Sequence, residues 1–389
     1  MIENKHRTNT IMTTANPMRR SALAIGVALV AGGLAAPAAA ELSFEADSGW
    51  KFGVNGHIPV FALMSDNDNL EEDAFRITTG FNPATAQFNV HAPTQFGLDV
   101  SGHFQLNSHL AGADGVQNSG FGRVDFGRQS GVESRVAEIA VSGIFGALNI
   151  GKGFGIYGTP AIGDAGSGMG VGLFSPNQGD ATAGRIGNGY FYANFNPRVI
   201  YTSPDMGGLQ FKVGAFQPEK PEGNTDALTE APRLEANVVW ASDMVTLWTS
   251  GFTQAIDSND PAVDDFTMNG IDFGGALALG DLGVRANYAT TQGTGNFVFG
   301  GHGFAGGAQE EDADQWYVEG TYGIGRATLG ASYGEGSDDL TDIDTDMTMI
   351  FARYKATDAW TILAEVQDFS SDAPDSDYSA VIVGSQLTF

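Results

Sequence analysis

The sequence predicts an all-β protein, a transmembrane antiparallel β-barrel of about sixteen strands. Three observations support this fold class. Apolar and polar residues alternate in short segments, and Gly, Asp, Asn and Pro separate these segments. After residue 40, no segment approaches the roughly 18 consecutive apolar residues that a spanning helix needs. A chain that crosses lipid without helices must close its sheet into a barrel, because every backbone polar group has to be hydrogen-bonded internally.

Period-two alternation defines the individual strands. In the first of them, Phe52 and Val54 alternate with Asn55 and His57. An even strand number, with short turns at one rim and long loops at the other, is typical of outer-membrane barrels. A soluble β-sandwich seldom contains sixteen long strands. The predicted strands are Trp50–Val60, Thr85–His91, Leu98–Leu110, Ser134–Ser142, Phe145–Lys152, Arg198–Ser203, Leu209–Gln217, Leu234–Ala241, Val245–Ala255, Phe266–Leu279, Gly283–Thr291, Gln315–Tyr322, Arg326–Glu335, Asp346–Lys355, Trp360–Phe369 and Tyr378–Phe389.

Residues 1–40 have the pattern of a signal peptide that is removed on export. Arg19 and Arg20 form a positive region, an apolar stretch follows, and three alanines ending at Ala40 form a small-residue cleavage site. Residues 41–389 are then expected to form one barrel domain.

The composition excludes several classes of function. A formal net charge of −27 argues against nucleic acid as a partner, because phosphate contacts require Lys and Arg. The chain has no cysteine, so disulfides do not stabilise it. Neither a Gly-x-Ser-x-Gly nor a His-Glu-x-x-His motif occurs, and the sequence therefore predicts no enzyme and no catalytic residue.

A long segment without strand periodicity, about residues 153–195, follows the fifth predicted strand. It is rich in Gly and contains Asp164 and Asp180. Patternless segments of this length are uncommon in compact domains and are usually functional. We expect the segment to fold inward and to set the bore of a pore.

Three stretches resemble the Gram-negative general porins, which are sixteen-stranded trimeric barrels. Residues 134–152 are similar to the fourth and fifth strands of that family, and 196–204 to the return from its inward-folded third loop. Phe389 at the C-terminus resembles the terminal aromatic residue that the barrel-assembly machinery recognises. The resemblance implies a homotrimer in the outer membrane of a Gram-negative bacterium, in contact with lipid and lipopolysaccharide. The implied solutes are small and hydrophilic.

The resemblance also identifies candidate lumen residues. His57 is similar to the basic position of the family's first strand, Gln87 occupies that of the second, and Arg135 matches the arginine of the fourth. Arg198 lies in the return segment, and we expect it to act with Arg135 against the loop carboxylates. With His and Gln in two of the basic positions, strong anion attraction is not expected.

Four histidines fall on the polar faces of the first three predicted strands: His57, His91, His103 and His109. In a barrel this face is the lumen. Polar faces collect polar residues, so we do not predict a metal site from this pattern. Acidic residues on the loop and few cations on the wall predict weak to moderate cation selectivity. The histidines should reduce that selectivity at low pH.

Three motif matches lack the context that their chemistry requires. Residues 146–152 match a phosphate-binding loop, but Gly153 replaces its Ser or Thr, and the three glycines of residues 153–158 lead into Pro160 and not into a helix. Residues 342–346 resemble the start of a calcium loop, but Met347 stands where Gly is required. No cofactor is predicted, and loosely bound Ca²⁺ in the acidic loops stays open as an alternative.

The sequence thus predicts an outer-membrane porin that passes small hydrophilic solutes and ions by passive diffusion. Two alternatives stay open. One is a substrate-selective channel of the same fold, and the other is a non-conducting barrel that serves as an adhesin or structural protein.

Overall fold

The computed structural model describes residues 42–66, 74–79, 83–108, 132–166, 184–218, 227–228, 231–258, 265–294, 312–339, 341–373 and 377–389. The predicted signal peptide lies outside these residues. Among the described residues, no helix is long and apolar enough to cross a membrane.

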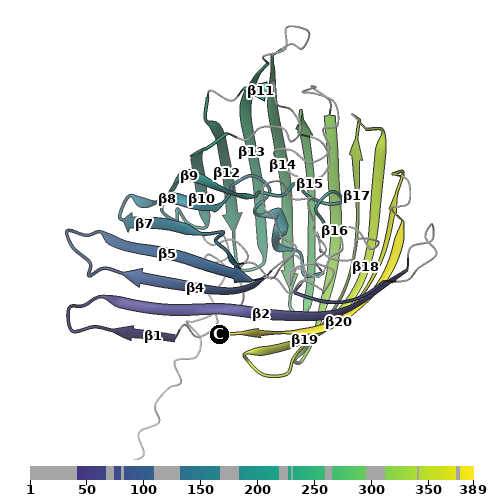
Figure 1. Ribbon diagram of the computed structural model, residues 1–389, viewed down its shortest axis with the longest axis horizontal. Helices are drawn as coiled ribbons and strands as arrows, with labels where there is room; N and C mark the ends of the chain where they lie inside the picture. The colour runs from purple at the N-terminus through teal and green to yellow at the C-terminus, as the bar shows by residue number, and fades with distance from the viewer. Residues whose placement is uncertain are drawn as a thin grey trace, which may run out of the picture.

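The described chain is almost entirely β-strand (Figure 1). Sixteen long strands carry the architecture, and four short ones extend it. The strands are β1 (Leu42–Glu45), β2 (Lys51–Asp66), β3 (Ala74–Thr78), β4 (Ala84–His91), β5 (Asp99–Ser108), β6 (Val132–Glu133), β7 (Ala137–Gly143), β8 (Gly146–Phe154), β9 (Phe195–Thr202), β10 (Leu209–Phe216), β11 (Ala227–Leu228), β12 (Arg233–Ala241), β13 (Val245–Ser258), β14 (Phe266–Leu279), β15 (Leu282–Gln292), β16 (Asp312–Ile324), β17 (Ala327–Asp338), β18 (Ile343–Lys355), β19 (Trp360–Ser371) and β20 (Tyr378–Thr388).

The sheet closes on itself. Each long strand pairs antiparallel with the next, and the last strand, β20, pairs with the first long strand, β2, from His57↔Thr388 to Asp66↔Ser379. C-terminal Phe389 continues this closure, because its backbone N–H donates to Gly56 O at 2.9 Å and its carbonyl accepts from Gly56 N at 2.7 Å. The prediction of a sixteen-stranded antiparallel barrel is confirmed.

Strand boundaries differ from the prediction by a few residues. The largest extension is in β2, whose predicted end is Val60 and whose observed end is Asp66. Pairing with β20 supplies hydrogen-bond partners for these extra residues, and the local alternation of side chains does not reveal them. At the other extreme, β7 begins at Ala137, three residues after the predicted start at Ser134.

The two rims of the barrel differ as expected. One rim has tight connections, such as the two-residue turns Gly280–Asp281 and Gly325–Arg326, where Gly280 and Gly325 have φ of 63° and 60°. Only Gly adopts this left-handed conformation without steric cost. The opposite rim carries the longer connections, among them the segment between β8 and β9.

Side chains alternate between the two faces of the barrel wall. Outward positions are large and apolar, for example Ile350 at 61% exposed and Val366 at 50% exposed. Inward positions on the same strands are buried, such as Met349 and Glu365. An exposed apolar outer band is the surface that a membrane-embedded barrel presents to lipid.

Candidate functional site: the interior of the barrel

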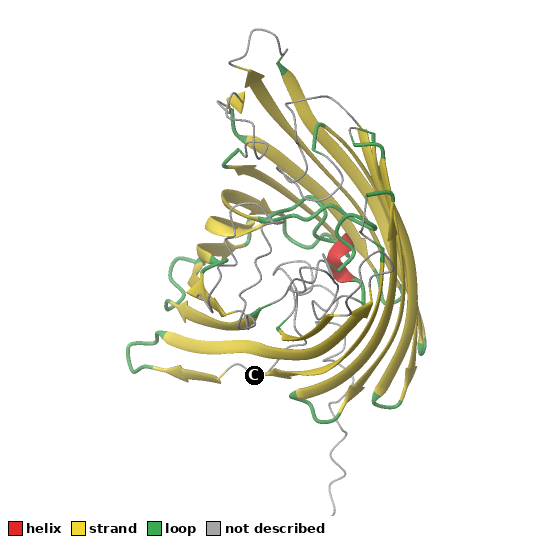
Figure 2. Cartoon of the chain, turned by 45° about the vertical axis from the view of Figure 1, so that its right-hand side comes forward, coloured by secondary structure: helices red, strands yellow, loops and turns green. Residues whose placement is uncertain are grey.

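The segment between β8 and β9 enters the barrel. Its described parts, residues 155–166 and 184–194, include the short 3₁₀ helix η2 (Ala161–Gly163), which lies within the ring of strands (Figure 2). The loop departs from the end of the β8–β9 hairpin, which we call its stem. There Phe154 pairs with Phe195, and Gly155 N donates to Asn194 O at 3.0 Å. The long segment predicted to fold inward thus has described parts inside the barrel.

Two apolar clusters pack the loop against one side of the inner wall. In the first cluster, Ala161, Ile186 and Tyr190 of the loop contact Tyr317 of β16. In the second, Tyr157 and Phe191 of the loop pack on Phe252, Ile256, Phe266, Met268, Ala289 and Ala313 of β13–β16. Burying aromatic side chains in this way stabilises the loop in one position. The described parts of the loop therefore form a hydrophobic core with the inner faces of β13–β16.

Polar contacts reinforce this position. The Tyr317 hydroxyl donates to Ala161 O at 2.7 Å, and Arg285 of β15 donates to Pro160 O at 2.8 Å. Tyr157 is fully enclosed, and burial raises its pKa well above the usual value, with Asp272 and Glu235 raising it further.

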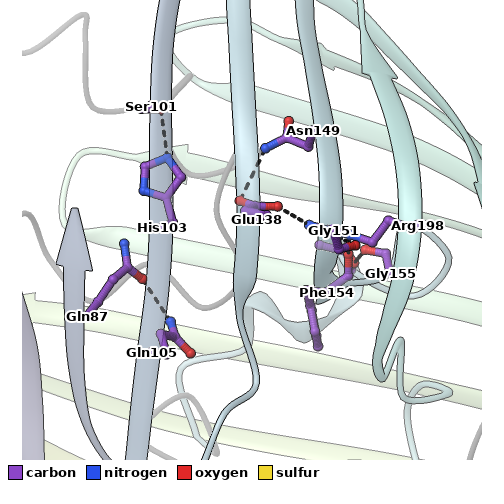
Figure 3. A network of polar contacts seen from close by, with 11 residues as sticks. Gln87, Ser101, His103, Gln105, Glu138, Asn149, Gly151, Phe154, Gly155 and Arg198 are labelled. Atoms are coloured by element: carbon purple, nitrogen blue, oxygen red, sulfur yellow. Dashed lines mark hydrogen bonds and ion pairs between the residues drawn. The ribbon is translucent and has the colours of Figure 1, made fainter. Parts of the chain in front are cut away.

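The wall formed by β4, β5, β7, β8 and β9 carries a polar network on its inner face (Figure 3). Glu138 Oε2 accepts from Arg198 Nη2 at 2.6 Å, and Glu138 Oε1 accepts from Asn149 at 3.2 Å. On the neighbouring strands, Gln105 donates to Gln87 at 2.8 Å. Amide and hydroxyl groups dominate this wall, as suits an aqueous lumen.

Three of the four predicted histidines lie on the inner face of this side of the barrel. His57 is buried on β2, and the rings of His91 and His103 meet edge-on with centroids 6.1 Å apart. His103 Nδ1 lies 2.8 Å from Asn89 Oδ1 and its Nε2 lies 3.0 Å from Ser101 Oγ. His109 lies outside the described residues. Within the described part of the chain, no group of three or more His, Asp or Glu side chains could hold a metal ion.

The two predicted arginines are brought close to the stem of the loop. Arg135 is buried, with its guanidinium 5.6 Å from the centroid of the Phe195 ring. Arg198 donates to the carbonyls of Phe154 and Gly151 at 3.3 and 3.1 Å in addition to its ion pair with Glu138. Both side chains thus contact the hairpin end from which the loop departs.

Of the two predicted loop carboxylates, Asp164 is described and is 2% exposed. Asp180 lies outside the described residues. Loosely bound Ca²⁺ in the acidic loops stays open as an alternative.

Further inner-face charges were missed by the sequence reasoning. Arg285 and Arg353 reach loop carbonyls from β15 and β18, and Arg233 of β12 donates to Glu235 at 2.8 Å. Lys212 of β10 lies in register with the buried Asn237. The inner wall therefore carries more cationic side chains than the sequence predicted. The signal was present for Arg285 and Lys212, which occupy the polar faces of predicted strands. It was absent for the other two, because Arg233 precedes the predicted start at Leu234 and Arg353 alternates in phase with Met349 and Phe351.

A family model described as Gram-negative porin matches residues 22–374. The chain belongs to the Gram-negative porin family. This porin is therefore an outer-membrane channel for small solutes. A search of the curated proteins finds no match.

Solved structures with the same fold include three outer-membrane proteins of low sequence identity. The outer membrane channel DcaP of Acinetobacter baumannii is 14% identical, with 89% of this porin and 99% of that chain covered and a TM-score of 0.69. The anion-selective porin from Comamonas acidovorans is 12% identical over 87% and 100% of the two chains, with a TM-score of 0.66. OmpT of Vibrio cholerae in its trimer form is 13% identical over 87% and 99%, with a TM-score of 0.57. At these identities, the likeness extends to the fold alone.

Proposed function

We propose that this porin forms a water-filled channel for passive diffusion of small hydrophilic solutes and ions. The observation that carries the proposal is the loop packed against the inner wall of a sixteen-stranded barrel. A barrel of this size leaves an aqueous channel unless something inside it narrows the bore. The loop supplies that narrowing, with size exclusion as the mechanism and no chemical step.

The charge distribution supports a weak to moderate preference for cations. The described extracellular ends of β16–β19 carry several carboxylates and no Lys or Arg. Inside the barrel, Arg198 and Arg233 are ion-paired with Glu138 and Glu235. An acidic mouth raises the local concentration of cations at the channel entrance.

Reversal potentials in a KCl gradient test this preference. At pH 7 we expect the potential to have the sign of a cation-preferring channel. At pH 5 it should move toward zero, because histidine is the side chain whose charge ordinarily changes between pH 5 and 8, and three histidines lie on the inner face. A variant with His57, His91 and His103 all replaced by Gln should lose most of this pH dependence.

The same recordings separate the alternatives. A preference for anions at pH 7 would contradict the proposed selectivity. A current that saturates with one solute would indicate a substrate-selective channel, and the absence of conductance would indicate a structural or adhesive barrel.

We infer that the porin assembles as a homotrimer through the wall of β4, β5, β7 and β8. These strands have 7–10 residues, whereas β13, β14, β16 and β18 have 13 or 14. A tilted strand needs about 9–11 residues to span a bilayer. β4, β5, β7 and β8 also contain no Trp or Tyr, the residues that mark the lipid interfaces of a barrel.

The outer face of this wall is suited to contact with another copy. It holds an apolar groove of about 650 Å³, lined by Gly102 and by aromatic and aliphatic side chains that include Phe44, Phe88, Phe104 and Ile139. Light scattering of the detergent-extracted protein should give the mass of three chains. The mass of a single chain would contradict the homotrimer.

A further inference from the structure

Three carboxylates on the inner wall accept hydrogen bonds from the backbone of the loop. They are Glu235 on β12, Asp272 on β14 and Glu319 on β16, and they therefore occupy alternate strands along the side of the barrel that the loop covers. Each is at most 4% exposed. Acidic residues inside a pore are ordinarily interpreted as ion-selecting groups. The contacts of these three indicate a different role.

Glu235 and Asp272 hold the first turn of the loop. Glu235 Oε2 accepts from the backbone N–H groups of Ile156 at 2.6 Å and Tyr157 at 3.0 Å. Asp272 Oδ2 accepts from Gly158 N at 3.1 Å, while its Oδ1 accepts from the Ser250 backbone and hydroxyl at 2.8 and 2.6 Å. Three consecutive loop amides are thus bound by two wall carboxylates.

Glu319 holds the loop beyond η2. Its Oε1 accepts from Ala165 N at 2.7 Å and its Oε2 from Gly166 N at 2.8 Å, so both oxygens are used by consecutive amides. The carbonyl of Gly166 in turn accepts from Arg353 at 3.1 Å. This two-pronged contact requires a carboxylate, because an amide side chain has only one oxygen.

The loop needs such partners for a physical reason. Residues 156–158 and 165–166 belong to no strand, so their N–H groups have no ladder partner. A buried backbone N–H without an acceptor is costly, and a hydrogen bond to an ionised acceptor is about twice as strong as a neutral one. The wall carboxylates satisfy these donors and at the same time fix where the loop lies across the lumen.

We propose that Glu235, Asp272 and Glu319 are positioning residues of the channel, which set the bore by holding the loop through its backbone amides. The proposal rests on the narrowing role of the loop described above. It assigns the three carboxylates to the loop and not to the passing ions.

Thiol labelling tests the proposal without measuring any current. The chain has no cysteine, so Ala161→Cys provides a single reporter on η2, where the native side chain is 0% exposed. In this background, Glu319→Gln should raise the labelling rate by a water-soluble thiol reagent about tenfold, because it removes a hydrogen bond to a charged acceptor. Asp272→Asn is a second variant with the same expected direction.

Glu365→Gln is the matched control. Glu365 is a buried inner-face carboxylate of β19 that accepts from Gln367 of its own strand at 2.6 Å. Its replacement should leave the labelling rate of the Ala161→Cys reporter within about twofold of the parent. Heat-modifiable migration on gels verifies that each barrel is folded.

Equal labelling in the Glu319 and Glu365 variants, or no increase in the Glu319 and Asp272 variants, would overturn the positioning role. Because labelling needs only a folded barrel, this result is independent of conductance. A channel that fails to conduct would contradict the proposed function and leave the positioning test readable.

Discussion

Deletion of residues 156–193 is expected to raise the unitary conductance at least about twofold, since a sixteen-stranded barrel freed of its internal loop leaves a wide aqueous channel. The geometry of the stem permits this deletion. Phe154 and Phe195 are already paired, so Gly155 and Asn194 would form a two-residue turn between β8 and β9. Gly at the first position of such a turn is favoured in hairpins, and Asn194 already has a positive φ of 55°. Single-channel recording in planar bilayers measures the change.

The deletion should also raise the size limit for neutral sugars in a vesicle swelling assay. A length-matched Gly/Ser replacement of the same residues is the control, because it keeps chain inside the barrel and removes the packing of Tyr157 and Phe191. We expect this control to conduct with large current fluctuations. If the deletion variant kept the parental conductance and size limit, the loop would not be the constriction.

Val318→Arg is expected to lower the free energy of unfolding by about 2–4 kcal/mol, the cost of an arginine on the lipid face near the middle of the bilayer. Val318 lies at the centre of β16, faces outward and is 42% exposed. Its neighbours Tyr317 and Glu319 face inward and are buried. Denaturant unfolding in lipid vesicles, followed by tryptophan fluorescence, measures the difference.

Gln105→Arg is the matched control for the outward substitution. Gln105 is at the middle of β5 on the inner face, where it contacts Gln87 and is partly exposed to the lumen. An arginine there stays in water, so we expect a loss below about 1 kcal/mol. Equal losses in the two variants would contradict the assignment of the outer face to lipid.

The fold was largely predictable because alternation is a local property. The segment Leu98–Leu110 shows the reason, since its apolar and polar residues follow a period of two that only a strand with two different faces produces. The observed β5, Asp99–Ser108, agrees within two residues at each end. Strand ends such as Asp66 were missed because pairing with a distant strand, and not the local pattern, extends them.

The candidate site was predictable only in part. Placing His57 and His103 on the inner face required nothing beyond period-two counting. The role of Arg198 was not visible, because its partners are Glu138, which lies 60 residues earlier, and the carbonyls of the loop stem. Spacing along the chain does not report contacts of this kind.

By itself, the sequence determined the fold class, the faces of the strands and the place of the loop in the chain, because each follows from residue patterns within a few neighbours. The tertiary structure alone decided what the inner charges do. The loop amides and their wall carboxylates are 78–154 residues apart in the chain, and only the closure of the barrel brings them into contact. A carboxylate that selects ions and one that holds a loop look the same in a sequence, since the difference lies in which donors face its oxygens.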